Sequence, residues 1–133
     1  MSTSEAEPTG VSDFFDWLAT THLANGDFTA LLVLVEIGEA RVTPLASSFL
    51  NFIGTDIGWS DMLALLSGAG RRWNGVCFFP QLDVDGPLDN GAARARLRQV
   101  EQRVSENRLV LNEGAFFDRL GRRMEVEELP GPH

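Results

Sequence analysis

Residues Thr29–Ile37, which decide the fold, read TALLVLVEI. The stretch is short, almost wholly apolar and rich in branched side chains, which favours a strand covered on both faces. The periodicity of the stretch is also compatible with a buried helical segment. Turn residues, Asn25-Gly26-Asp27 before the stretch and Gly38 after it, bound it at the length of a strand. We therefore expect a central strand here.

The segments around this strand carry helical and extended patterns. Apolar residues at helical spacing between a capping residue and a glycine predict helices, and short apolar runs predict strands. The expected helices are Ser12–Asn25, Thr43–Gly54, Ser60–Gly68 and Ala92–Glu106. The other expected strands are Trp73–Pro80, Leu109–Leu111 and a closing hairpin from Phe116 to Glu127.

These elements predict a single α+β domain. We expect a small mixed sheet of about four to five strands with about three to four helices packed on it. The 133 residues have the size of one ordinary domain. Residues 1–10 are expected to be a disordered leader, residues 11–129 the domain and residues 130–133 a flexible tail, since both ends are rich in polar residues and proline.

The charge balance limits the classes of partner. The net charge is −8, and all 11 basic residues are arginine, so the chain has no lysine. An acidic chain repels a phosphate backbone, so we expect neither nucleic acid nor a membrane surface as a partner. Mechanisms that need a lysine, such as a Schiff base or a P-loop, are excluded.

The histidines and the cysteine suggest no catalytic pair. Cys77 lies in an apolar run, which favours a small core residue over a nucleophile, and one thiol allows no intramolecular disulfide. His22 is expected at the end of the first helix, near its negative pole. The amino-terminal residues are polar and acidic where a signal peptide would be basic and then apolar, so we expect a cytoplasmic protein.

The segment Leu82–Gly91 is the sharpest local pattern. Asp83, Asp85 and Asp89 offer the hard oxygen ligands that Ca²⁺ or Mg²⁺ prefers. The spacing is not that of an EF-hand, because Gly86 directly follows Asp85. Aspartate also forms turns and caps helices through local hydrogen bonds. The sequence favours the turn-and-cap interpretation, and a metal site at these three residues is the alternative.

Arginines on the long helix and one tryptophan are the candidate interface residues. Arg94 and Arg98 lie four residues apart on one side of the predicted helix, where like charges repel unless a negative group lies between them. That group is a ligand phosphate, an acidic surface of a partner, or the chain's own Glu125, Glu127 and Glu128. Trp59, between Gly58 and Ser60, is a candidate exposed anchor for a partner.

We expect a small acidic domain that acts through protein–protein contact, as a homodimer, and not as an enzyme. Segregation of charge between an arginine-bearing helix and an acidic final strand allows the two to complement each other across a twofold axis. The alternative is a domain that binds a divalent metal, an anion or a small ligand, with hydrolase activity at the Asp83–Asp89 loop. A pocket for an apolar ligand between the helices and the sheet is a third hypothesis.

Overall fold

The computed structural model describes residues 9–39, 41–70 and 72–126. Its helices are α1 (Thr9–Asn25), α2 (Trp59–Ser67), α3 (Asn90–Glu106) and the 3-10 helix η1 (Arg108–Glu113). Its strands are β2 (Phe28–Ile37), β3 (Val42–Phe52), β4 (Gly75–Gln81), β5 (Ala115–Asp118) and β6 (Arg123–Met124). Most of the expected leader, the expected tail and the end of the predicted hairpin at Glu127 lie outside the described residues.

The predicted α+β class is confirmed. The five strands form one sheet in the order β3-β2-β4-β5-β6. The sheet is not mixed as expected, because every pair of neighbouring strands in the described part of the chain is antiparallel. The predicted strand at Thr29–Ile37 is β2, which pairs with β3 on one side and β4 on the other.

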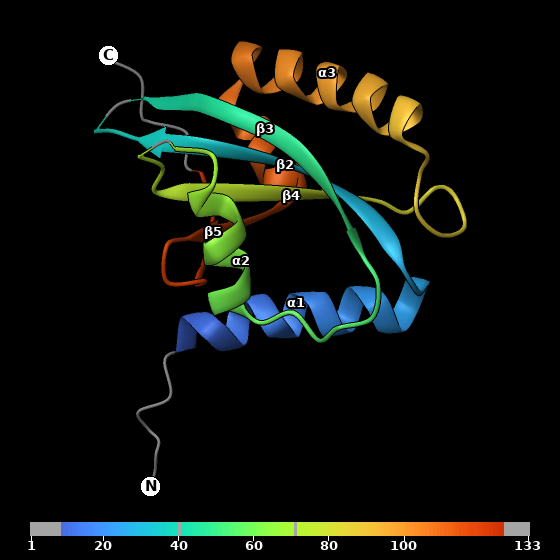
Figure 1. Ribbon diagram of the computed structural model, residues 1–133. Helices are drawn as coiled ribbons and strands as arrows, with labels where there is room; N and C mark the ends of the chain where they lie inside the picture. Colours follow the sequence, from blue (N-terminus) through green and yellow to red (C-terminus); the bar gives the residue numbers. More distant parts are fainter. Residues whose placement is uncertain (1–8, 40, 71, 127–133) are drawn as a thin grey trace, which may run out of the picture.

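The helices cover both faces of this sheet. Figure 1 shows α1 and α2 on one face and α3 on the other. Leu32 and Leu34 of β2 belong to the core under α1 and α2, whereas Leu31, Val33 and Val35 belong to the core under α3. Successive side chains of a strand point to opposite faces, so a strand between two helical layers must be apolar at every position.

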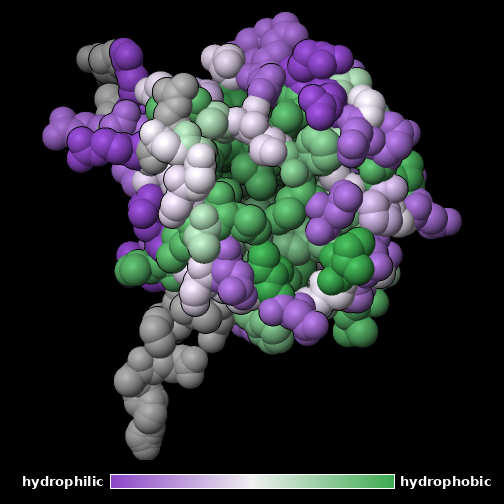
Figure 2. All heavy atoms as spheres, in the orientation of Figure 1, coloured by the Kyte–Doolittle hydropathy of each residue, from purple (hydrophilic) through white to green (hydrophobic). Residues whose placement is uncertain are grey.

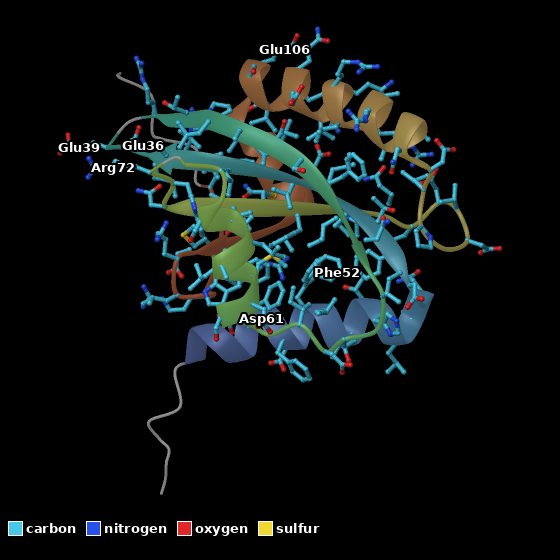
Figure 3. All side chains as sticks on the ribbon, viewed as in Figure 1. Glu36, Glu39, Phe52, Asp61, Arg72 and Glu106 are labelled. Atoms are coloured by element: carbon cyan, nitrogen blue, oxygen red, sulfur yellow. The ribbon has the colours of Figure 1, made fainter. Side chains whose placement is uncertain are left out.

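A cluster of aromatic rings joins α1 to the sheet. The ring centroids of Trp17 and Phe78 lie 5.4 Å apart, and those of Phe14 and Phe117 lie 5.6 Å apart. Figure 3 shows Phe52 extending from β3 toward α1. The apolar face of α1 therefore contains Phe14, Trp17 and Leu18, whereas Phe15 is 49% exposed and does not belong to it.

The predicted helix at Thr43–Gly54 is wrong, because residues 42–52 form strand β3. A Thr-Pro pair at Thr43-Pro44 is a local signal for a helix start, but here the segment forms a hairpin with β2. Val35 pairs with Pro44 and Leu34 with Ala46, so Leu45 is an extra residue in a β-bulge. Proline is tolerated at bulges and on edge strands, and β3 is an edge strand.

Two smaller expectations also change. Leu109–Leu111 was expected to be a strand, but it lies in η1, whose start is capped by the side chain of Asn107. The predicted Trp73–Pro80 strand begins later, at Gly75, and continues through Pro80 to Gln81. Strand β5 pairs only with Gly75–Phe78, so Pro80 lies where β4 has a single neighbouring strand.

The remaining predicted elements are confirmed. The Ser60–Gly68 helix is α2, and the closing hairpin is β5 and β6, although β6 is only two residues long. The Ala92–Glu106 helix is α3, with Ala93, Val100 and Val104 buried against the sheet.

We predict that Gly114→Ala lowers the free energy of unfolding by about 1–3 kcal/mol, because the chain before β5 passes close to β4. A Cβ at Gly114 would lie 2.5 Å from the carbonyl oxygen of Phe78 and 2.8 Å from the Sγ of Cys77. Urea denaturation measures the change. Gly91→Ala is the matched control, since its Cβ would meet nothing closer than 3.4 Å in the first turn of α3. Equal stability of the two variants would contradict this packing.

Candidate interaction surface

Strand β3 presents an unusual free edge of the sheet. It has 11 residues, VTPLASSFLNF, and none of them is charged. Edge strands are normally protected from pairing by charged residues, proline, bulges or shortness. The opposite edge, β6, is short, with only two residues. On β3 the proline and the bulge lie at its beginning, so Ala46–Phe52 is a regular and uncharged edge, and no other strand in the described part of the chain pairs with its outer side.

A groove lies beside this edge, between α2 and β3. It encloses about 540 Å³ and is lined by uncharged residues, among them Ala46 and Leu50 of β3 and Met62 and Leu66 of α2. Figure 2 shows hydrophobic side chains filling a hollow in the middle of this face, with hydrophilic residues around it. Leu65, on the α2 side of the groove, is 55% exposed. The groove therefore adds apolar surface to the free edge.

One flank of α3 is neutralised within the chain. Arg96 makes two hydrogen bonds to the carboxylate of Asp83, of 2.6 and 3.0 Å. Arg103 binds the carboxylate of Glu113 at 2.7 Å. Both carboxylates belong to segments on the β4 and η1 side of the helix, so this flank has its own counter-charges.

The other flank of α3 faces the free edge. The hydroxyl of Ser47 in β3 donates a hydrogen bond to the carboxylate of Glu101, which fixes the orientation of this flank. Arg98 and Arg94 lie three and seven residues before Glu101, so all three share one side of the helix. Both arginines are exposed, and neither forms an ion pair with any described residue. The structure thus places both arginines beside the free edge of β3.

Glu125, the described residue of the acidic end of the chain, forms no ion pair with these arginines. Glu125 directly follows β6, which is the opposite edge of the sheet from β3. Glu127 and Glu128 lie outside the described residues. A contact between the arginine flank and this acidic end would join two different edges, which is a head-to-tail arrangement and not a twofold one.

Trp59 is not an exposed anchor, contrary to the expectation from sequence. Its side chain is only 3% exposed, and its ring centroid lies 5.1 Å from that of Phe14. The indole N–H donates a 2.9 Å hydrogen bond to the carbonyl oxygen of Arg119. The first turn of α2 packs against α1 and β5, which is why this ring is part of the core.

The structure does not gather the three aspartates into a metal site. Asp83 binds Arg96, and this hydrogen bond lowers the pKa of the Asp83 carboxyl. Asp89 caps α3 by accepting a 2.9 Å hydrogen bond from the backbone N–H of Ala92. No group of three or more His, Cys, Asp or Glu side chains in the described ranges has a geometry that would hold a metal ion. The cap interpretation therefore matches the contact of Asp89, whereas the contact of Asp83 is an ion pair with Arg96.

His22 and Cys77 have structural partners. The Nε2 of His22 lies 2.8 Å from the carboxylate of Asp27, whose pKa this hydrogen bond lowers. Asp27 also accepts a 3.0 Å bond from the N–H of Gly54, so it ties the end of α1 to the chain after β3. Cys77 is completely buried, and its thiol donates to the carbonyl oxygen of Leu111. These contacts stabilise the fold.

We predict that Cys77 reacts with iodoacetamide only when the protein unfolds, because burial raises the pKa of its thiol and excludes the reagent. Mass spectrometry after labelling at pH 8 measures the modification, with and without denaturant. A Ser105→Cys variant is the control, because Ser105 is exposed and its thiol will be labelled in the folded protein. Labelling of both thiols at similar rates in native buffer would contradict the burial of Cys77.

The comparisons with known proteins leave the function to be argued from this geometry. The sequence matches no family model, no curated protein and no solved structure. Within the described residues, no helix combines the length and the apolar character that crossing a membrane requires.

Proposed function

We propose that this protein is a non-catalytic interaction domain that acts through protein–protein contact and forms a homodimer through the free edge of β3. The observation that carries the proposal is an 11-residue edge strand without any charged side chain. A long, uncharged edge strand is a template for pairing with another chain. Natural domains use such edges for strand addition, in which backbone hydrogen bonds hold the partner.

The proposed dimer pairs β3 with β3 of a second copy in the antiparallel direction. A twofold axis across the edge makes every contact occur twice and joins the two five-stranded sheets into one continuous sheet. Pairing uses the regular part of the edge, Ala46–Phe52, because the bulge at Leu45 interrupts the beginning of the strand. Each copy carries a net charge of −8, so an uncharged edge is also where two copies approach with the least repulsion.

Apolar side chains beside the edge support the same contact. Ala46, Ser48 and Leu50 lie on the face of β3 that borders the groove, because their partners on β2 are Leu34, Leu32 and Ala30. In the paired sheet these residues of both copies form one surface across the axis. Association then covers apolar surface that the single copy exposes to water, which stabilises the dimer.

The proposal also assigns a compartment and excludes some partners. It places the domain in the cytoplasm, where a buried free thiol such as Cys77 is ordinary. The strongly acidic balance makes nucleic acid and anionic membranes poor partners. The counterpart of the surface is therefore another protein, and first of all a second copy of this chain.

A second candidate function is the binding of a small uncharged apolar ligand in the groove. Its volume of about 540 Å³ lies within the range of about 300–1,000 Å³ that is typical of ligand sites. Native mass spectrometry of the purified protein tests it: a monomer with a constant added small-molecule mass favours the ligand. An unmodified dimer mass favours strand pairing.

We predict that Ser48→Lys weakens dimerisation at least about tenfold, because two like charges then face each other across the paired edges. Ser48 is exposed, so the monomer should keep its stability, which circular dichroism and urea denaturation will verify. Sedimentation velocity over a range of protein concentrations measures the dissociation constant.

The control for this experiment is Thr20→Lys, which adds the same charge at an exposed position of α1. It should leave the dimer unchanged. A wild-type protein that stays monomeric at the highest soluble concentration, or equal effects of the two variants, would refute the proposed dimer.

A further inference from the structure

The charged flank of α3 beside the edge indicates what fixes the register of the dimer. This inference rests on the proposed pairing of β3 with a second copy. Arg94, Arg98 and Glu101 share the flank that faces the edge, and the bond from Ser47 places Glu101 above a known position on β3. The charged residues on the opposite flank form ion pairs within the chain. The charged residues on the edge flank are therefore the ones available to bind a second copy.

The direction of the helix brings opposite charges together. Figure 1 shows that α3 lies above β3 and runs in the opposite direction to it. A twofold axis across the edge places the two α3 helices on the same face of the joined sheet, side by side and antiparallel. The arginines of each helix then lie opposite the Glu101 end of the other.

The spacing along the two elements supports this match. A helix rises about 1.5 Å per residue and a strand about 3.3 Å, so Arg98 and Arg94 lie over positions roughly one and three strand residues beyond Ser47. With the axis at Ser48, Ser47 pairs with Phe49 of the second copy; with the axis at Phe49, it pairs with Asn51. In the first register the second copy's Glu101 lies over Phe49, between the positions under Arg98 and Arg94. In the second register it lies over Asn51, about one strand residue beyond the position under Arg94.

We propose that reciprocal ion pairs, in which Arg94 and Arg98 of one copy bind Glu101 of the other, hold the two copies in register. The carboxylate supplies the negative group that two arginines four residues apart require. Each dimer contains this arrangement twice, once on each side of the axis. Such complementary charges contribute mainly to specificity, because they penalise every register that brings like charges together.

Charge reversal tests the proposal. The Arg94→Glu/Arg98→Glu variant makes this flank wholly negative, and Glu101→Arg makes it wholly positive. Each variant alone should raise the dissociation constant of the homodimer at least about tenfold through like-charge repulsion. An equimolar mixture of the two should form a heterodimer, which native mass spectrometry separates by mass, and whose affinity falls as salt rises.

Glu106→Arg is the matched control, because it reverses a charge on the same helix. Glu106 is exposed and bonds to Gln102, away from the edge flank, and Figure 3 shows it at the far end of α3. Its homodimer should be unaffected. Urea denaturation and circular dichroism of all variants verify that the monomer fold is intact.

The outcomes separate this inference from the proposed function. Loss of both homodimers with recovery in the mixture supports the reciprocal ion pairs. A wild-type dimer that Ser48→Lys disrupts but neither charge reversal changes would overturn the ion pairs and leave the strand pairing standing. A wild-type monomer would overturn both.

Discussion

The burial of β2 on both faces and along both edges is the constraint on which the rest of the structure depends. Residues Phe28–Val35 are buried without interruption, so helices must cover both faces of the sheet. Helices α1 and α2 do so on one face and α3 on the other. Strands β3 and β4 must satisfy its backbone groups, which makes β3 the outer strand of the sheet.

That position turns a structural strand into a candidate binding surface. Strand β3 forms backbone hydrogen bonds with β2 along one edge, and no described strand pairs with its other edge. Its serines, apolar residues and asparagine provide no charge to repel another strand. The same strand borders the apolar groove and lies under the charged flank of α3. In the proposed dimer, backbone pairing, apolar burial and ion pairing would therefore all act at one site.

Local patterns predicted the buried strand, the α+β class and three of the helices, because cores impose periodicity on sequence. They did not predict β3. Thr43-Pro44 imitates a helix start, and only the pairing with β2, a contact distant in sequence, decides for a strand. One signal against a helix was present in the sequence. None of the 11 residues of this segment is charged, whereas a surface helix normally carries charged residues on its exposed face. For the candidate surface, the spacing of Arg94 and Arg98 in the sequence suggested that they share one side of the helix, but it could not show which flank of α3 faces the edge. The burial of Trp59 depends on packing with Phe14, which spacing does not reveal.

Hydrogen–deuterium exchange at increasing protein concentration tests most directly whether the edge of β3 is paired. The account predicts that backbone amides within Ala46–Phe52 become protected as the dimer forms, while amides of β6 at the other edge keep the same exchange rate. If the outward-facing amides of β3 are already protected at the lowest protein concentration, a concentration-dependent dimer is not what protects them. Exchange in this segment that stays fast and independent of concentration would contradict the proposal that this strand is the interface.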